Sequence, residues 1–224
     1  MERIERAAIH RALGDDGRLQ IVDELSLSDR TPHDLARITG FETNLLAHHL
    51  GVLEAAALIR RRVSSGDRRR RYISLDTELV RGFLPGRLLA ATSVVFVCTH
   101  NSARSQVAEA LFRSRCGALV QSAGPNPRQA VHPKAIKVGT EMGVDLSTHK
   151  PKGFSEVTGS PDLVVSVCDL AVESDIPFEA RILHWSIPDP VETGRIGDFR
   201  SSFTEIDRRV GQMVGAIENE RQQA

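Results

Sequence analysis

The sequence predicts two domains of different class: helices closed by a β-hairpin at the N-terminal end, and an α/β domain with a central parallel sheet flanked by helices at the C-terminal end. Its 224 residues suffice for two hydrophobic cores. Residues 1–85 show apolar residues at helical spacing and then two arginine-rich segments, whereas residues 92–224 alternate short apolar runs with amphipathic segments. We assign residues 86–91, which follow Pro85, to a linker.

The composition indicates a soluble globular protein. Its 29 Lys and Arg residues balance 29 Asp and Glu residues, and no window approaches the roughly 18 apolar residues that a membrane span needs. The N-terminal MERIERAAIHRALGDD is charged and lacks the apolar core of a secretory signal. Three cysteines, Cys98, Cys116 and Cys168, are too few for a disulfide framework. We expect a cytoplasmic protein without membrane contact.

The first domain opens with helical segments. GRLQIVDELSL has apolar residues at helical spacing, and TPHDLARITG begins with Thr31 as N-cap and Pro32 in the first turn. Gly40 then breaks the chain before ETNLLAHHLGVLEAAAL, which predicts an amphipathic helix. The neighbouring histidines of that helix, His48 and His49, are expected on its surface. One side of it carries three leucines: Leu46, Leu50 and Leu53.

An arginine-rich β-hairpin closes this domain. LIRRRV and RRRYISL are the predicted strands, and Ser-Ser-Gly-Asp supplies a turn in which Gly66 is free to take a positive φ. Helix, turn, helix and hairpin in this order is the layout of a winged helix-turn-helix domain. The segment from LARITGF to YISL resembles the arsenic-repressor (ArsR) family of winged-helix transcription regulators, most clearly in HHLGVLEAAALI.

That resemblance implies a homodimer that binds DNA. The helix from about Glu42 would enter the major groove, and the arginines of the hairpin would hold phosphates or enter the minor groove. The family's cysteine pair for arsenite is absent, and His33 and Asp34 lie in its place, so we expect no metal site. An isolated arginine run is otherwise typical of a solvated surface. The DNA-binding residues on this interpretation are Thr43, Asn44, His48, Arg68, Arg69, Arg70 and Arg71.

The second domain begins near Thr92 with alternating elements. VVFVC, ALVQSAG, DLVVSVC and RILHW are the predicted strands. RSQVAEALFRSR, HPKAIKVGTEMG and a terminal segment near FTEIDRRVGQMVGAIENE are the predicted helices. Such alternation indicates a parallel sheet, in which ligands bind beyond the carboxyl ends of the strands. Cys98 falls at that edge.

The loop after Cys98 is suited to hold a tetrahedral oxyanion. Thr99, His100, Asn101, Ser102 and Ala103 lie between a strand end and a helix start, so their backbone N–H groups and the helix N-terminus can point to one centre. Arg104 can clamp two oxygens of that anion. Cys98 in this positive field is expected as the reactive thiolate, with Ser105 as a hydrogen-bond donor to the sulfur. Asp189, in the turn of HWSIPDP, is a candidate general acid for the leaving oxygen.

These motifs resemble the low-molecular-weight phosphatase fold, and within it the cysteine-dependent arsenate reductases. CTHNSARSQVAEAL, SAG, VHPKAI, VVSVCD and HWSIPDP occur in the order found in those enzymes, with Gln106 where tyrosine phosphatases commonly carry proline. The resemblance implies that Cys98 attacks arsenate, that Asp189 assists the loss of water, and that Cys168 then attacks Cys98 to release arsenite and leave a disulfide. A buried core thiol is the alternative for Cys168.

The sequence departs from three-cysteine reductases at the third thiol, where Asp175 stands. Cys116 lies too far along the predicted helix to replace it, about 18 Å at 1.5 Å per residue, and is expected to be structural. We therefore expect no bound cofactor and an external thiol reductant, either thioredoxin acting on a Cys98–Cys168 disulfide or a low-molecular-weight thiol such as mycothiol acting on the adduct.

Some members of the resembled family bind potassium beside the loop. Asn101, Glu109 and Ser122 match members of that site, and Lys152 stands where an aspartate is expected. We expect the Lys152 ammonium to replace the cation, so that activity depends little on potassium. A solvated surface lysine is the alternative.

Three functions remain open from sequence. The first is an arsenate reductase fused to an ArsR-like DNA-binding regulator. The second is a low-molecular-weight protein tyrosine phosphatase, because arsenate and phosphate are both tetrahedral oxyanions. The third is a non-catalytic transcription factor that senses an oxyanion or redox state.

Overall fold

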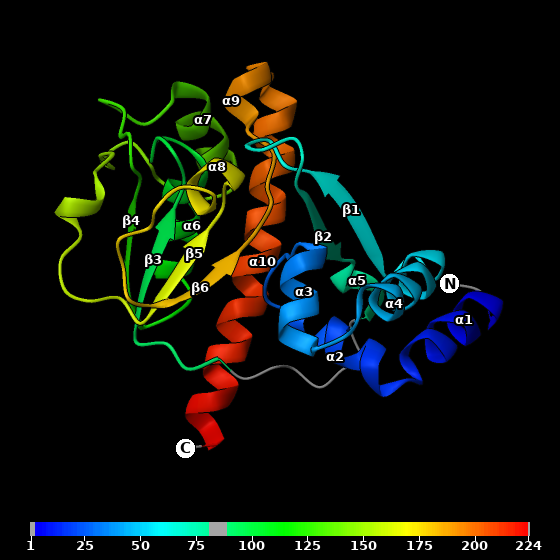
Figure 1. Cartoon of the computed structure of the whole chain (residues 1–224). Helices are drawn as coiled ribbons and strands as arrows, with labels where there is room; N and C mark the ends of the chain where they lie inside the picture. Colours follow the sequence, from blue (N-terminus) through cyan, green and yellow to red (C-terminus); the bar gives the residue numbers. More distant parts are fainter. Residues whose placement is uncertain (1–2, 81–88, 224) are drawn as a thin grey trace. The chain divides into compact units, whose positions relative to one another are not determined.

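The computed structural model describes residues 3–80 and 89–223 (Figure 1). The chain forms two compact units. Unit 1 is built from residues up to 87 and unit 2 from residues 88 onward, apart from the short turn at residues 65–67. The linker expected at residues 86–91 lies partly outside the described residues, which resume at Leu89.

Unit 1 has helices followed by a hairpin, in the order that the sequence predicts. The helix α1 was not predicted; it contributes Ile9, Ala12 and Leu13 to the core. The elements are α1 (Arg3–Leu13), α2 (Asp16–Leu25), α3 (Pro32–Thr39), α4 (Thr43–Ala55), β1 (Ile59–Val63), β2 (Arg71–Leu75) and α5 (Thr77–Val80).

Local capping explains where α3 begins and ends. The Thr31 side chain accepts a hydrogen bond from the backbone N–H of Asp34, whose carboxylate accepts one from the backbone of Thr31, so a capping box closes the first turn. Pro32 occupies the first turn, where its missing N–H costs nothing. Gly40 ends the helix at φ 74°, a left-handed conformation that glycine adopts without strain.

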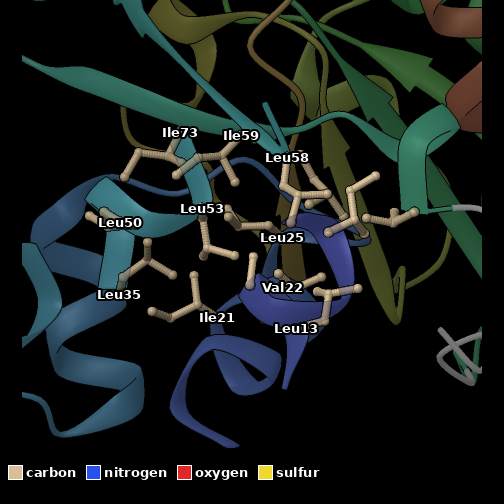
Figure 2. Packing of buried hydrophobic residues seen from close by; sticks show 14 of the residues in the cluster. Leu13, Ile21, Val22, Leu25, Leu35, Leu50, Leu53, Leu58, Ile59 and Ile73 are labelled. Atoms are coloured by element: carbon tan, nitrogen blue, oxygen red, sulfur yellow. The ribbon is translucent and has the colours of Figure 1, made fainter. Parts of the chain in front are cut away.

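The core of unit 1 joins the helices to the hairpin (Figure 2). Leu35 and Leu53 are fully buried, as is Ile73 of β2. His49 corrects the expectation that it lies on the helix surface: only 6% of it is exposed, and its ring lies 5.2 Å from that of Phe41. The reason is helical spacing, because residue 49 shares the buried side of α4 with Leu46, Leu50 and Leu53.

The hairpin of unit 1 is antiparallel, as predicted. Its register pairs Ile59 with Leu75 and Val63 with Arg71. Ile59, Tyr72 and Ile73 are buried, whereas the remaining residues of β1 are exposed. The arginines therefore line the solvent side of a strand pair anchored by its apolar residues.

Unit 2 contains a four-stranded parallel sheet in the order β4-β3-β5-β6. The strands are β3 (Ser93–Val97), β4 (Leu119–Ala123), β5 (Leu163–Ser166) and β6 (Arg181–His184). β3 and β5 are the inner strands, and every residue of β5 is buried. This explains why their sequences are continuous apolar runs rather than alternating ones.

The strand order places a topological switch point between β3 and β5. From β3 the chain goes to one side of the sheet to form β4 and then returns to the other side to form β5. Ligands of open parallel sheets bind at such a point, beyond the carboxyl ends of the strands. Cys98 follows β3 and Cys168 follows β5 after one residue, so both thiols lie at this edge.

Helices cover the sheet of unit 2. α6 (Arg104–Arg113) contacts β3 and β4 and packs along α10 (Ile196–Gln223), which also contacts α7 (Pro133–Glu141). The terminal helix begins earlier than its expected start near residue 203. Three short helical segments complete the unit: η1 (Phe154–Glu156), α8 (Asp169–Val172) and α9 (Pro190–Thr193). No helix among the described residues is long and apolar enough to cross a bilayer.

Candidate active site

The loop at residues 98–104, here called the active-site loop, connects the central strand β3 to α6. Cys98 is buried and its backbone N–H donates to the Ala123 carbonyl at 3.3 Å, which extends the sheet by one residue. Asn101 takes a positive φ of 46°, which asparagine tolerates better than most residues. The loop thus turns back sharply before the helix starts at Arg104.

The carbonyl groups of the active-site loop are turned to one side by a neighbouring segment. Backbone N–H groups of Asn126, Arg128 and His132 donate to the carbonyls of Thr99, His100 and Ser102, at 3.0, 3.1 and 2.8 Å. In a trans peptide the following N–H points the opposite way. Within the described parts of the chain, the backbone N–H groups of residues 99–104 have no protein acceptor. They are available to one anion.

Gly124 makes this arrangement possible. A Cβ atom at this position would overlap with the carbonyl oxygen of Cys98 and would lie 2.9 Å from that of Thr99 and 3.1 Å from the backbone nitrogen of Asn101. The backbone after β4 therefore runs directly against the active-site loop. Only a residue without a side chain permits that approach.

The Cys98 sulfur receives a hydrogen bond whose direction the network determines. Ser105 Oγ lies 3.0 Å from Cys98 Sγ, and Asn101 Nδ2 donates to the same Oγ at 2.8 Å. Because an amide nitrogen only donates, the Ser105 hydroxyl keeps its own proton for the sulfur. A donor aimed at the sulfur favours its anionic form.

Gln106 holds Asn101 in its unusual conformation. Its Nε2 donates to the backbone oxygen and the Oδ1 of Asn101, each at 2.9 Å, and its Oε1 lies 2.8 Å from His149 Nδ1. The backbone N–H of Lys152 also donates to Asn101 Oδ1, at 2.8 Å. The orientation of the Asn101 amide follows, because both groups that reach Oδ1 are donors.

Three of the four predicted cation-site residues are joined by hydrogen bonds, and the exception is the Lys152 ammonium. Asn101 Nδ2 donates to Ser122 Oγ at 2.9 Å, and Ser122 Oγ donates to Glu109 Oε2 at 2.6 Å. The Lys152 ammonium instead donates to Gln121 Oε1 at 2.9 Å, which corrects the expectation that it takes the place of a cation. The positive charge beside Glu109 is the guanidinium of Arg113, one turn along α6. Low dependence on potassium stays a prediction.

Arg104 is buried at the mouth of the loop with its fork already oriented. Nη1 donates to the Ile187 carbonyl at 2.8 Å, and Nη2 donates to Asp189 Oδ2 at 2.7 Å. Burial acts to lower the pKa of Arg104, but negative charge at Cys168, Asp189 and Cys98 outweighs it and raises the pKa above its ordinary value. The Arg104 guanidinium is therefore a permanent cation close to the sulfurs of Cys98 and Cys168.

Cys168 lies at the same place, although it is 70 residues away in sequence. Its Sγ lies 3.2 Å from Thr99 Oγ1 and 3.5 Å from Arg104 Nη2. Cys168 is the N-cap of α8, and its carbonyl accepts a hydrogen bond from Ser166 Oγ at 2.8 Å. The structure thus brings a second thiol to the residue that directly follows Cys98.

Comparison with known proteins places unit 2 in a family. Residues 93–223, more than half of the chain, match the family described as low molecular weight phosphotyrosine protein phosphatase. The chain belongs to this phosphatase family.

Proteins that are similar to this chain in sequence include arsenate reductases. Arsenate reductase 2 of Staphylococcus saprophyticus is 34% identical over 127 residues, which is 54% of this chain and 92% of the relative. The arsenate reductase of Staphylococcus xylosus is 35% identical over 132 residues, 57% of this chain and 94% of the relative. A solved structure of an arsenate reductase in the phosphate binding state is 28% identical, with a TM-score of 0.50 over 56% of this chain and 98% of that chain.

The phosphatase-family site has a basic rim. Burial, assisted by the charge of Arg128, lowers the pKa of His100. Burial and the charge of Lys134 likewise lower the pKa of His132, whose ring stacks on Phe199 at 4.9 Å. Both histidines are therefore mainly neutral near pH 7 and contribute less positive charge to the rim than Arg128.

Asp189 combines two structural roles in the phosphatase-family site. It is the N-cap of α9, where its Oδ1 accepts a hydrogen bond from the Val191 N–H at 2.9 Å. Its Oδ2 faces Arg104. The proline that follows it, Pro190, starts the helix. The carboxyl group therefore reaches the site from the end of the edge strand β6.

The other two positions considered for thiol chemistry lie apart from the active-site loop. Cys116 is buried just beyond the end of α6, where its N–H donates to the Phe112 carbonyl at 2.9 Å. Asp175, in the place of a third cysteine, is exposed after α8. All three cysteines are free thiols in the structure.

The DNA-binding residues predicted in unit 1 are all exposed. Thr43 and Asn44 begin α4, and His48 lies one turn further along it. The arginines at positions 68–71 lie at the start of β2 and just before it.

His33 and Asp34 lie in the first turn of α3. Among the described residues, no group of three or more His, Cys, Asp or Glu could hold a metal ion.

Sequence reasoning missed three residues that support the active-site loop. The positioning contacts of Gln106 were not foreseen, although the residue was noted as a family marker. Gly124 carried one signal, because a glycine at the end of a predicted strand often marks a close approach of another backbone segment. Arg113 follows Glu109 by four residues, the spacing at which helical side chains meet, and this signal was available in the sequence.

Proposed function

We propose that unit 2 is an arsenate reductase that uses Cys98 as nucleophile and Cys168 as the second thiol. The observation that carries the proposal is the position of Cys168 Sγ, 3.2 Å from Thr99 Oγ1 and 3.5 Å from Arg104 Nη2. A phosphoryl transfer that ends in hydrolysis needs one thiol and water. A reduction of arsenic needs two electrons, which two thiols supply when they form a disulfide.

The first half of the reaction makes a covalent adduct. The Cys98 thiolate attacks arsenic, and one hydroxyl group of arsenate leaves as water with a proton that Asp189 has taken up from solvent. The N–H groups of the active-site loop and the Arg104 guanidinium hold the remaining oxygens. Arsenic stays As(V) in this step, and a sulfur–arsenic bond replaces an oxygen–arsenic bond.

The second half reduces arsenic. The Cys168 thiolate attacks Cys98 Sγ, a sulfur–sulfur bond forms, and the electron pair of the sulfur–arsenic bond stays on arsenic. Arsenic becomes As(III) and leaves as arsenite after taking up protons from water. One arsenate and two thiols thereby give one arsenite, one water and one disulfide.

An external thiol closes the cycle in this proposal. Asp175 occupies the position of a third cysteine, and Cys116 is buried beyond the far end of α6. Reduction therefore falls to thioredoxin acting on a Cys98–Cys168 disulfide, or to a low-molecular-weight thiol such as mycothiol that attacks the adduct. The arsenate reductase relatives in staphylococci support thiol-dependent chemistry.

The competing activity is hydrolysis of a phosphate ester, such as phosphotyrosine. The N–H groups of the active-site loop fit phosphate as well as arsenate, and one related reductase has been solved in a phosphate binding state. Cys168 favours the reductase, because ester hydrolysis gives it no role.

A direct assay separates the two activities. The purified chain is incubated with arsenate and either a thioredoxin system or mycothiol with its recycling enzymes, and separately with p-nitrophenyl phosphate. We expect arsenite in the first assay, slow or no ester cleavage in the second, and neither product from Cys98→Ser. Rapid ester cleavage without arsenite would overturn the proposal in favour of the phosphatase.

A Cys168→Ser variant tests the role of the second thiol. Loss of arsenite formation with both reductants is the result expected if Cys168 attacks Cys98. Full turnover of this variant with a small thiol would remove Cys168 from the mechanism. Mass spectrometry of the arsenate-treated protein checks for a loss of two mass units, which the Cys98–Cys168 disulfide requires.

We propose that unit 1 is an ArsR-like DNA-binding regulator that acts as a homodimer. The observation in its favour is a cavity of about 540 Å³ beside the N-terminal turn of α3 and the arginine-rich hairpin. Guanidinium groups and a helix N-terminus both suit phosphate oxygens. The residues that line it include Thr31, His33, Arg61, Arg69, Arg70 and Arg71.

Gel-shift assays with DNA from upstream of the gene test this second function. We expect binding by the full chain and its loss when all four arginines at positions 68–71 become glutamine. Size-exclusion chromatography with light scattering tests for the dimer. Binding that responds to arsenate in a chain without turnover would favour the non-catalytic sensor. The absence of binding to any fragment would overturn the assignment of unit 1.

A further inference from the structure

We propose that Arg113 is a positioning residue that keeps the Cys98 sulfur supplied with a hydrogen bond, through a buried chain of polar groups that crosses unit 2. The inference rests on the proposed function only in taking Cys98 as the nucleophile. The chain of contacts runs Arg113, Glu109, Ser122, Asn101, Ser105 and Cys98.

From Arg113 to Ser122, each hydrogen bond of this series can run in only one direction. The guanidinium of Arg113 can only donate, so the Glu109 carboxylate accepts through Oε1. The other carboxylate oxygen accepts from the Ser122 hydroxyl at 2.6 Å. Ser122 has then used its only proton, and its oxygen is left to accept from Asn101 Nδ2 at 2.9 Å.

The same logic continues to the sulfur. The second Nδ2 proton of Asn101 goes to Ser105 Oγ at 2.8 Å, which obliges the Ser105 hydroxyl to donate to Cys98 Sγ at 3.0 Å. Asn101, Ser105 and Ser122 are almost fully buried, so water does not compete for these bonds. A charge on the surface thus stands at the outer end of a hydrogen-bond chain that reaches the nucleophile.

Arg113 is suited to the outer end of the chain by its position. Its side chain is 59% exposed, whereas that of Glu109 is 11% exposed. The guanidinium of Arg113 supplies a counter-charge to this mostly buried carboxylate. Arg113 Nη2 also donates to the Val120 carbonyl of β4 at 3.1 Å, which holds the guanidinium in place. The Lys152 ammonium does not serve, because it pairs with Gln121.

Loss of the Arg113 charge therefore weakens the chain from its outer end. Without the Arg113 guanidinium, the Glu109 side chain can turn toward water, and Ser122 then loses its acceptor. Asn101 keeps its contacts with Gln106 and the Lys152 N–H, but the acceptor of one of its Nδ2 protons is no longer fixed, so the hydrogen bond from Ser105 to the sulfur is less firmly directed. The thiol of Cys98 would ionise at a higher pH and react more slowly at neutral pH.

The experiment measures the alkylation of Cys98 by iodoacetamide between pH 5 and 9, followed by mass spectrometry of the Cys98 peptide. Arg113→Gln is expected to move the midpoint to higher pH and to slow alkylation at pH 7 about tenfold, the equivalent of one pH unit. Arg113→Lys is expected to stay within about threefold of the parent chain. The other ionisable groups near Cys98 are Arg104, Cys168, Asp189 and His100, and they are unchanged in these variants.

Arg115→Gln is the matched control. This arginine lies just beyond the end of α6 and is also exposed. Its Nη2 pairs with Asp207 of α10 at 2.5 Å, and neither residue belongs to the series of hydrogen bonds that reaches Cys98. Its alkylation profile is expected to match that of the parent. A second variant, Ser122→Ala, interrupts the chain without a change of charge and is expected to shift the profile in the same direction as Arg113→Gln.

An unchanged midpoint in both Arg113→Gln and Ser122→Ala would overturn the proposal. Should Arg113→Gln fail to fold by circular dichroism, the Ser122→Ala profile decides alone. The readout needs no arsenate and no reductant. An absence of arsenite from the parent chain would therefore count against the proposed reductase and would leave the alkylation result intact.

Discussion

The active-site loop at residues 98–104 and the arginine hairpin at residues 59–75 both present hydrogen-bond donors to anions. They differ in how firmly the surrounding protein holds those donors. The loop presents backbone N–H groups and one buried guanidinium, each held by neighbours such as Asn126, His132 and Ile187. The hairpin presents several exposed guanidinium groups, and those of Arg60 and Arg61 pair with Asp76 and Glu54. The donors of the loop converge on one centre before a ligand arrives, whereas those of the hairpin are spread over an exposed strand pair.

This difference explains what each region can select. Donors fixed around one centre match a small tetrahedral ion and cost little to organise when it binds. Exposed arginines attract phosphate charge of any shape, and they act through counterion release and long-range attraction. We therefore expect the loop to be sensitive to sub-ångström changes and the hairpin to be sensitive to total charge.

The largest effect is expected from Gly124→Ala, which tests the rigidity of the loop. The added Cβ would overlap with the Cys98 carbonyl oxygen, so the backbone must move. A shift of about 1 Å in a reacting group costs about 100-fold in rate, and overpacking costs about 1–3 kcal/mol of stability. Arsenite formation and thermal unfolding measure these effects. Gly215→Ala, where no atom lies within 4 Å of the added group, should leave both unchanged or slightly raise stability.

The next largest effect is expected from replacing an arginine by lysine, once in the active-site loop and once in the hairpin. Arg104→Lys removes the fork that reaches Ile187 and Asp189, and we expect about 100-fold lower kcat/KM for arsenate. Arg68→Lys keeps an exposed positive charge, and DNA affinity should change less than about twofold. Equal losses at the two sites would contradict the proposed contrast between geometry and charge.

The salt concentration should affect binding by the two regions to different extents. Four phosphate contacts through the hairpin arginines predict that DNA affinity falls about 100-fold between 50 and 200 mM NaCl. The KM for arsenate should change less than about threefold over the same range, because buried charges are screened less. Fluorescence anisotropy with labelled DNA and initial-rate assays measure the two responses. A flat DNA response would remove the phosphate role of the hairpin.

The smallest effect concerns acid stability, where unit 2 again uses a partly buried pair and unit 1 an exposed one. Burial opposes ionisation of Glu205, but hydrogen bonds and charge from Arg208 and Arg209 lower its pKa from 4.5 to about 2. The ion pair therefore stabilises the fold above about pH 4.5, and this contribution disappears as the pH falls through about 2.

Glu205→Gln should accordingly lower the thermal midpoint at pH 7 and lose its effect near pH 2. Glu54→Gln, which removes the exposed partner of Arg61, should leave the midpoint unchanged at both values. Differential scanning calorimetry on the full chain measures both variants. A Glu205→Gln variant that is equally destabilised at pH 7 and pH 2 would contradict this account.

The sequence predicted most elements and the active-site loop, because local signals determine both. Strong apolar runs marked β3 and β5, and Thr31 followed by Pro32 marked the start of α3. Short or weakly patterned elements such as α1, α8 and α9 were missed. His49 was assigned to the surface, although its spacing from Leu46 and Leu53 places it on the buried side of α4.

Contacts distant in sequence could not be predicted in the same way. Lys152 was expected beside Glu109, but its backbone N–H, rather than its ammonium, contacts Asn101. A sequence position does not say which end of a long side chain meets a neighbour, because rotamers are decided by packing. The same limit applies to Ile187 and Asp189, which accept hydrogen bonds from Arg104 and lie more than 80 positions later in the sequence.

The sequence by itself determined that a thiol, an arginine and a run of backbone N–H groups share one short loop, because residues 98–104 are adjacent in the chain. Only the tertiary structure decided that Cys168 and Asp189 meet that loop, and that Arg113 connects to it through Glu109. The physical reason is the strand order, which gathers the carboxyl ends of β3, β5 and β6 at one edge of the sheet.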